Sequence, residues 1–186
     1  MNFNTHSRLE GRHAFLSPSN YHWLNYSQER LEERYTSARA AQRGTEIHAF
    51  GHEAIRLGIP LPDLPLTLNM YVNDAIGYKM EVEQALYFSE NCFGHADTLC
   101  FRNGLLRIHD LKTGTTPASA HQLEIYAALF CLEYIISPHE IELELRIYQN
   151  NEVAYFQPFA ETIVHVMDKI ILFDQKIEEL KEVASW

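Results

Sequence analysis

Hydrophobic and polar residues alternate along the chain in patterns that predict both helices and strands. Residues 27–58 are rich in Glu, Arg, Ala and Leu and predict a helix, with Ser27 as its N-cap and Gly58-Ile59-Pro60 as its end. Gly44 divides this stretch, either as a kink or as a break between two helices. Residues 79–88 then alternate between apolar and polar side chains, which is the two-residue period of a β-strand.

A β-hairpin is predicted in the middle of the chain. Residues 97–102 and 105–112 form its strands, because Asn103-Gly104 between them is the dipeptide typical of a type I′ turn. Side chains on a strand repeat every two residues, so one face of the second strand carries Leu106, Ile108, Asp110 and Lys112. Placing a carboxylate and an amine in line with buried aliphatic residues costs free energy unless something charged is bound there. The end of this strand is therefore the first candidate for a functional site.

The last third of the chain predicts two helices and two strands. A helix is expected from Ser119 to Ile136, followed by a strand over 140–149, a turn at Asn150-Asn151 and a return strand over 153–156. A final helix spans about 160–183. Its apolar stripe fits either the core or an oligomer seam and comprises Ile163, Val166, Ile170, Phe173, Ile177 and Leu180.

Two segments have weaker patterns. Residues 13–26 begin with a turn at Ser17-Pro18-Ser19 and continue as a short helix through Trp23. The proline-rich connection over 60–78 is either an irregular surface segment or includes a short helix, and the pattern does not decide between them.

Composition indicates one globular domain over residues 1–186, with 46% hydrophobic residues. No apolar run approaches the roughly 20 residues of a membrane span, and the first residues lack the apolar centre of a signal peptide. We therefore expect a cytoplasmic protein, in the host cytoplasm if a phage encodes it, with no membrane partner. Three cysteines, Cys92, Cys100 and Cys131, are too few and wrongly spaced for a disulfide framework or a zinc knuckle. They also exclude a four-cysteine iron–sulfur cluster within one chain.

The net charge of −10 argues against a uniformly basic surface for nucleic acid. Charge is uneven, however, with a net of +1 over residues 1–56 and −11 over 57–186. Arg30 and Arg34 have acidic neighbours on the same predicted helix, whereas Arg39 and Arg43 lack them on their N-terminal side. Any positive surface is therefore expected in the N-terminal third.

The hairpin and the long helix both carry groups that can bind a cation. Asp97 can approach Asp110 across the hairpin, and the two carboxylates would supply hard oxygen ligands to a divalent ion. Lys112 would then lie beside a phosphate oxygen or the attacking water. His48 and His52 are one helical turn apart and can in principle bind one metal. The plainer interpretation is a surface hairpin with a solvated Asp–Lys pair.

Three short motifs resemble those of a nuclease family. Asp97, followed after twelve residues by Asp110-Leu111-Lys112, resembles the D…(D/E)xK signature of the PD-(D/E)xK nuclease superfamily, with Ala96 where proline often stands. Gly44 and His48 resemble the GxxxH motif of the RecB-like branch. Gln122 and Tyr126, ten residues past the lysine, resemble its QxxxY motif. The resemblance covers about residues 13–160.

The resemblance implies an α/β fold with a restriction-endonuclease-like core, in which a mixed central sheet is flanked by helices. It further implies that His48, Asp97, Asp110 and the carbonyl of Leu111 hold Mg²⁺ or Mn²⁺, and that Lys112 acts on the attacking water. Auxiliary or DNA-contacting roles fall to Glu83 (or Glu81), Gln122, Tyr126 and Arg43, while His52 is expected to be structural. Tyr26 stands near the place where several relatives have a cysteine, so no iron–sulfur cluster is expected.

The function implied is that of a metal-dependent deoxyribonuclease, most closely an exonuclease acting on DNA ends in phage or bacterial recombination and repair. Its partners would be DNA, a recombinase, helicase or other phage replication protein, and further copies of itself in a homo-oligomer. Two alternatives stay open. One is a catalytically silent module within a recombination or defence complex, which the strong acidity favours. The other is a small-molecule metallo-hydrolase that uses the two histidines.

Overall fold

The computed structural model describes residues 5–184, whose contacts divide the chain into a unit that ends at Arg43 and a unit that begins at Gly44. The first unit contains two short 3-10 helices, Ser7–Leu9 and Pro18–Asn25, and the beginning of α1 (Gln28–Leu57). The N–H of Arg30 donates to Oγ of Ser27 at 3.2 Å, which confirms the expected N-cap. A single domain over the whole chain stays a prediction.

The second unit is an α/β structure built on a five-stranded mixed sheet. Neighbouring strands pair in the order β1-β2-β3-β4-β5, and all pairs are antiparallel except β3 with β4. The parallel pair is joined by a crossover through α3, as parallel pairing requires. The elements are α2 (Thr67–Tyr78), β1 (Glu81–Ser89), β2 (Cys92–Arg102), β3 (Leu105–Leu111), α3 (His121–Tyr134), the 3-10 helix Pro138–Glu140, β4 (Glu142–Gln149), β5 (Glu152–Phe156) and α4 (Ala160–Ala184).

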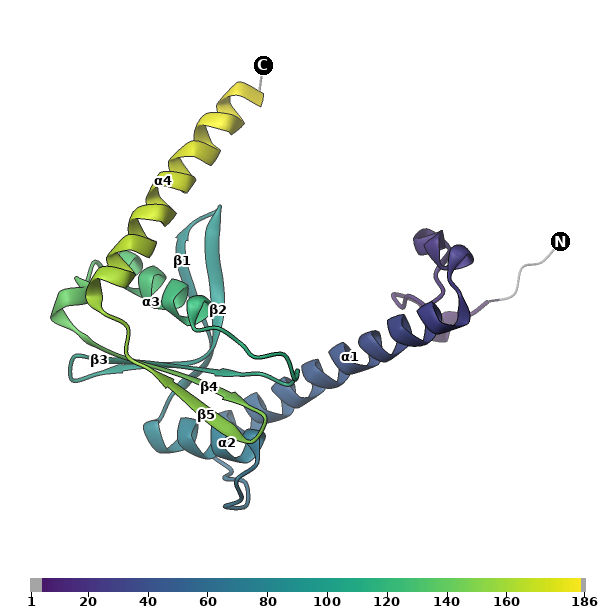
Figure 1. Cartoon of the computed structure of the whole chain (residues 1–186), viewed down its shortest axis with the longest axis horizontal. Coiled ribbons are helices and arrows are strands. Elements are labelled where there is room, and N and C mark those ends of the chain that lie inside the picture. Colours follow the sequence, from purple (N-terminus) through teal and green to yellow (C-terminus); the bar gives the residue numbers. More distant parts are fainter. Residues whose placement is uncertain (1–4, 185–186) are drawn as a thin grey trace. The chain divides into compact units, whose positions relative to one another are not determined.

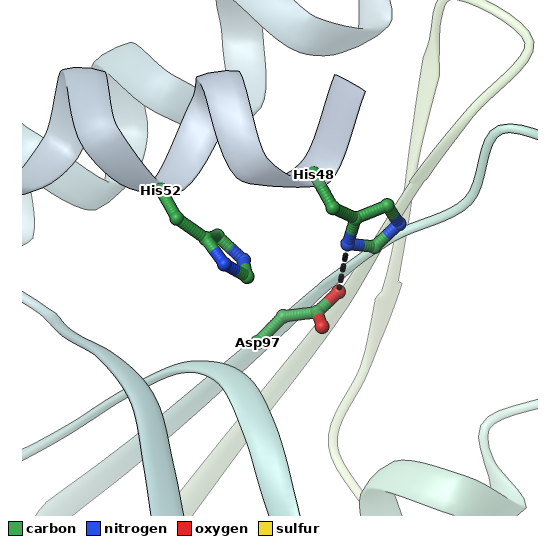
Figure 2. Close-up of side chains that lie close together, drawn as sticks. All are labelled: His48, His52 and Asp97. Atoms are coloured by element: carbon green, nitrogen blue, oxygen red, sulfur yellow. Dashed lines mark ion pairs between the residues drawn. The ribbon is translucent and has the colours of Figure 1, made fainter. Parts of the chain in front are cut away.

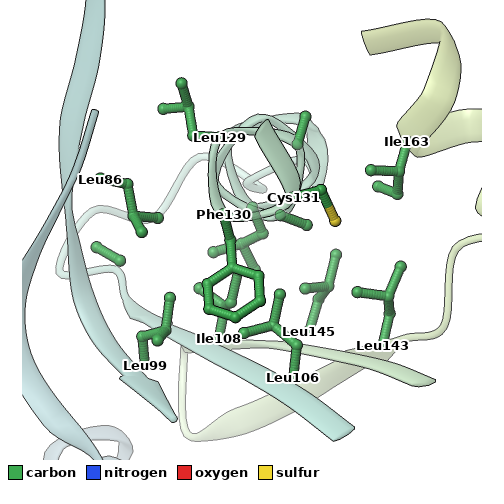
Figure 3. Close-up of a cluster of buried hydrophobic side chains, with 14 of the residues drawn as sticks. Leu86, Leu99, Leu106, Ile108, Leu129, Phe130, Cys131, Leu143, Leu145 and Ile163 are labelled. Atoms are coloured by element: carbon green, nitrogen blue, oxygen red, sulfur yellow. The ribbon is translucent and has the colours of Figure 1, made fainter. Parts of the chain in front are cut away.

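Helices cover both faces of this sheet (Figure 1). On one face, α3 and α4 bury the side chains of the strands, with Phe130 over Leu106 and Ile108 and with Ile163 beside Leu143 (Figure 3). On the other face, α2 and the part of α1 after Gly44 pack against Leu111 and other strand residues. Burying each large aliphatic side chain stabilises the fold by roughly 1.5–3 kcal/mol. The predicted mixed sheet flanked by helices is therefore confirmed.

Two of the tight turns follow the predicted dipeptides. Asn103 and Gly104 have φ of 53° and 76°, the left-handed pair that a type I′ turn needs. Asn150 and Asn151 also have positive φ, 52° and 61°, and join β4 to β5. Local chemistry therefore determines both hairpins.

The structure sharpens the expectations for three helical segments. α1 runs without interruption through Gly44, so the alternative of a break between two helices is wrong. The proline-rich connection contains a full helix, α2, that begins at Thr67. The apolar stripe of α4 is split: Ile163 is fully buried, whereas Phe173 and Leu180 are 57% and 56% exposed. Among residues 5–184, no helix has the length and apolar character needed to cross a membrane.

Candidate functional site

The site lies where β2 and β3 separate. β2 pairs with β1 over nearly its whole length, but with β3 only from Arg102 opposite Leu105 to Thr98 opposite His109. We call the point beyond Thr98 the fork. Asp97 and Asp110 are the first residues past it on their strands and lie on the same face.

The carboxylate of Asp97 replaces a missing cross-strand hydrogen bond at the fork. The N–H of Leu111 no longer meets a carbonyl of β2 and donates instead to Oδ2 of Asp97 at 3.0 Å. This bond fixes the carboxylate between the two strands. The sequence predicted that Asp97 approaches Asp110; the hydrogen bond goes to the next residue of β3, Leu111, and Asp97 lies in the middle of β2 rather than at its start.

Gly44 allows α1 to approach the segment that follows β3. A Cβ at this position would lie 2.7 Å from Oγ1 of Thr113, closer than a real side chain tolerates. One turn later along α1, Nδ1 of His48 lies 3.5 Å from Oδ2 of Asp97 (Figure 2). The glycine and histidine of the GxxxH pattern therefore have distinct physical roles: close approach and contact with the carboxylate.

Lys112 connects the carboxylate of Asp110 to α3. Its Nζ lies 3.0 and 2.9 Å from the two carboxylate oxygens of Asp110 and donates to Oε1 of Gln122 at 2.8 Å. Nε2 of Gln122 in turn donates to Oη of Tyr126 at 3.3 Å. A Cβ at Gly94 of β2 would lie 3.0 Å from the Tyr126 ring, so this glycine makes room for it. The DxK and QxxxY residues form one hydrogen-bonded chain.

The two carboxylates have different proton affinities. Burial tends to raise the pKa of Asp97, but the hydrogen bond with His48 and the N–H of Leu111 outweigh it and lower that pKa overall. The pKa of Asp110 is raised, mainly by burial and further by the charge of Asp97, which Lys112 offsets only in part. Ionised together they would repel each other, a cost that a bound cation relieves.

His52 lies in the site, although the sequence analysis expected this residue to be structural. One ligand atom each from His48, His52 and Asp97 lies within 4.8 Å of the others, and the three side chains point toward one another in Figure 2. The pKa of His48 is raised, chiefly by its interaction with Asp97, whereas burial lowers that of His52. The one-turn spacing of the two histidines was the signal that could have placed His52 here.

Glu83, rather than Glu81, reaches this cluster. It stands opposite Asp97 in the register of β1 with β2 and has a φ of 52°, which turns its side chain out of the regular strand. Its Oε1 lies 3.5 Å from Nδ1 of His52, and Arg56 binds Oε2 and lowers the pKa of this carboxyl. Arg43 belongs to the first unit and is exposed, so its DNA-contacting role stays a prediction.

Comparison with known proteins adds no relative: no family model, curated protein or solved structure matches this chain. The restriction-endonuclease-like core and the family assignment accordingly stay predictions, and the geometry of the second unit carries the functional argument.

Proposed function

We propose that the protein is a divalent-metal-dependent deoxyribonuclease that hydrolyses phosphodiester bonds. The observation that carries this proposal is the arrangement at the fork. Asp97 and Asp110 lie on one face just past the last pair of β2 with β3, and Lys112 is hydrogen-bonded to Asp110 and Gln122. Two carboxylates with an adjacent amine form a group that can hold a cation and act on a phosphate beside it.

The donor set fits a hard to borderline divalent cation. Asp97, Asp110, the carbonyl of Leu111 and His48 would hold Mg²⁺ or Mn²⁺, which when bound polarises the scissile phosphate and lowers the pKa of a bound water. Lys112 now uses its charge to neutralise Asp110. A cation would compete for that carboxylate and free the amine to orient the water or to stabilise charge on the phosphate.

Room for part of a substrate exists next to Lys112. A cavity of about 250 Å³ opens beside it. Its lining includes the apolar side chains of Ile47 and Leu68 and the hydroxyl of Thr113. A sugar or base attached to the scissile phosphate would find apolar contacts there. Gln122 accepts a hydrogen bond from the lysine, and Gln122 and Tyr126 are among the residues expected to contact the nucleic acid.

Exonuclease action on DNA ends, in phage or bacterial recombination or repair, is proposed on the resemblance of the motifs. The net charge of −10 disfavours unaided binding along a broad DNA surface. DNA is therefore expected to enter through a narrow channel, through an oligomer, or with the help of a partner such as a recombinase or helicase.

The same acidity favours the second candidate, a catalytically silent module that keeps this fold within a larger complex. Gel-shift titration with Ca²⁺, which supports binding but not cleavage, tests whether the chain binds DNA at all. Failure to bind any DNA, together with absence of cleavage, would favour the silent module.

The deciding experiment is degradation of end-labelled linear and closed circular DNA, single- and double-stranded, with Mg²⁺ or Mn²⁺. Loss of linear DNA alone supports an exonuclease, and nicking of the circle supports an endonuclease. Because an imidazole ligand suits Mn²⁺ at least as well as Mg²⁺, we expect higher activity with Mn²⁺. Equal or lower activity across a full Mn²⁺ titration would argue against His48 as a ligand.

A further inference from the structure

His52 has an unusual environment for a histidine that is only structural. Its side chain is 6% exposed, Nδ1 faces Oε1 of Glu83, and Nε2 has no hydrogen-bond partner among residues 5–184. Buried nitrogens in folded proteins nearly always have a partner. The free nitrogen therefore points to a ligand that the chain itself does not supply.

The histidine–carboxylate contacts in this cluster are looser than good hydrogen bonds, which leaves room for an ion. His48 lies 3.5 Å from Asp97, and His52 lies 3.5 Å from Glu83, both longer than a good N–H···O bond. Ligands around a tetrahedral ion with bonds of about 2.1 Å are roughly 3.4 Å apart. The ligand atoms of His48, His52 and Asp97, within 4.8 Å of one another, need to close by about 1 Å to reach this spacing.

Asp110 lies outside this histidine cluster. Within the described residues the cluster comprises His48, His52 and Asp97, while both carboxylate oxygens of Asp110 lie within 3.0 Å of the amine of Lys112. Asp97 is thus flanked by two different groups. On one side are the imidazoles of α1, and on the other are Asp110 and the end of β3.

Glu83 and Arg56 complete the arrangement behind His52. Metal-bound histidines almost always direct their second nitrogen to a carboxylate or carbonyl, which fixes the ring and its tautomer. Glu83 occupies that position at Nδ1, and Arg56 holds its other oxygen. The positive φ of Glu83, at the level of Asp97, aims the carboxylate toward His52.

We propose that His48, His52 and Asp97 form a second metal position, distinct from that at Asp110, which takes a first-row transition-metal ion in preference to Mg²⁺. Two imidazoles and one carboxylate favour ions such as Mn²⁺, Co²⁺ or Zn²⁺. This inference rests on the proposed function, because Asp97 would be a ligand common to both positions and His48 would belong to the histidine position. Asp110 and the carbonyl of Leu111 then remain for the other ion. Two ions that share a carboxylate are the arrangement of two-metal phosphodiester hydrolysis.

The test counts ions and identifies their ligands in the full-length chain. Mn²⁺ binding is measured by calorimetry, and the visible spectrum of bound Co²⁺ reports imidazole ligation. The variants are His52→Asn, Asp110→Asn and, as a matched control, His139→Asn at an exposed position in the 3-10 helix Pro138–Glu140. We expect two Mn²⁺ ions in the wild type and the control, and one in each of the other two. The imidazole-dependent Co²⁺ spectrum should persist in Asp110→Asn and disappear in His52→Asn.

Failure of this inference is distinguishable from failure of the proposed function. If His52→Asn keeps the wild-type ion count and Co²⁺ spectrum, the second position is overturned while the Asp110 position stands. If Asp110→Asn keeps both ions, the ligand set of the proposed nuclease is wrong and the histidine position stands. If the wild type binds one ion and only His52→Asn loses it, the histidine position is supported. If the wild type binds one ion and only Asp110→Asn loses it, the histidine position is overturned.

A second variant covers the case in which His52→Asn does not fold. Glu83→Gln keeps the shape of the side chain and removes the charge that holds Nδ1 of His52. Loss of such an outer carboxylate typically weakens metal binding about 10–100-fold. We expect that weakening for Co²⁺ at the histidine position, with Mn²⁺ at the Asp110 position unchanged. Unchanged Co²⁺ affinity in a folded Glu83→Gln variant would overturn the proposal.

Discussion

The second unit contains two clusters of charged residues on the same sheet, and they differ in how fully their charges are paired. The fork cluster comprises His48, His52, Asp97, Asp110 and Lys112. The second, which we call the arginine cluster, lies on the face covered by α2 and comprises Asp74, Tyr78, Arg107, His109, Glu144, Arg146 and Tyr148. In the arginine cluster every carboxylate has a short charged or hydroxyl partner, whereas at the fork only Asp110, paired with Lys112, has a short charged partner.

In the arginine cluster each carboxylate has short charged or hydroxyl partners. Glu144 lies 3.0 Å from Arg107 and 2.9 Å from Arg146, and Asp74 accepts from Arg146 at 2.9 Å and from Tyr148 at 2.6 Å. At the fork, both histidine–carboxylate contacts are 3.5 Å. Buried charges that are fully paired hold a structure together, whereas loosely paired ones are suited to bind something. This difference separates a structural network from a candidate active site.

The largest effect is expected from Lys112→Ala on cleavage. Loss of one charged group that acts on the transition state costs on the order of 10³-fold in rate, while the carboxylates that hold the cation are unchanged. We therefore expect DNA cleavage to fall by that factor, with metal and DNA binding retained. Single-turnover cleavage of labelled DNA measures it, and Lys176→Ala, an exposed lysine paired with Glu179, is the control. Cleavage at the wild-type rate would remove the lysine from the mechanism.

Arg146→Met tests the arginine cluster through stability. The substitution removes the ion pairs that Arg146 makes with Asp74 and Glu144. Removing one partner of a buried ion pair typically costs about 3–5 kcal/mol of stability. Urea unfolding should show a decrease of that size in the free energy of unfolding. Arg30→Met, which removes an exposed pair with Glu33, should change it by less than about 1 kcal/mol. Similar effects of the two substitutions would contradict the structural role of the arginine cluster.

The arginine cluster also predicts how stability depends on pH. Burial, with the charges of Arg146 and Arg107, lowers the pKa of His109 to about 3, against about 6.5 for an unfolded histidine. Between these values the unfolded chain binds a proton that the folded chain does not. Stability is therefore full above pH 6.5 and falls as the pH decreases toward 3.

The expected loss from His109 over this pH interval is on the order of 4 kcal/mol. Thermal or urea unfolding of wild type and His109→Gln across pH 3–7 measures it, and the difference between the two curves isolates this residue from other acid-sensitive groups. Parallel curves would show that His109 does not stay neutral in the folded protein.

The smallest effect has the opposite sign and belongs to the fork. Because the pKa of Asp110 is raised, its ionised form destabilises the metal-free fold. Asp110→Asn should therefore increase the free energy of unfolding without metal by about 1 kcal/mol at pH 7, while removing metal binding at that position. Asp168→Asn on the exposed side of α4 should change neither quantity. A less stable Asp110→Asn protein would mean that the pair with Lys112 outweighs the burial of the carboxylate.

Features determined by local sequence were the ones that the sequence predicted well. Asn103-Gly104 specifies a tight turn, and the register of that turn brings Asp97 and Asp110 to one face. Gly44 shows the limit of local propensity. Glycine weakens a helix, yet Gly44 lies inside α1, where a Cβ would come within 2.7 Å of Oγ1 of Thr113.

The remaining features depend on packing that no local pattern encodes. The alternation of Glu144 and Arg146 in β4 is what a solvated strand face would also show, and only the position of α2 makes it a buried network. His52 enters the site because the irregularity at Glu83 places a carboxylate behind it. That irregularity arises from strand pairing, so the one-turn spacing from His48 was the signal in the sequence that could have pointed to His52.

The short paired segment between the turn and the fork has a consequence for how the protein tolerates insertions. Five cross-strand pairs separate Asn103-Gly104 from Asp97 and Asp110. The number of residues between the turn and the fork therefore determines which side chains lie opposite each other at the fork. One added residue in β3 would place His109 opposite Asp97 and turn Asp110 to the other face, since neighbouring strand residues point to opposite sides. The turn is therefore under the same constraint as the residues that it aligns, although it takes no part in their chemistry.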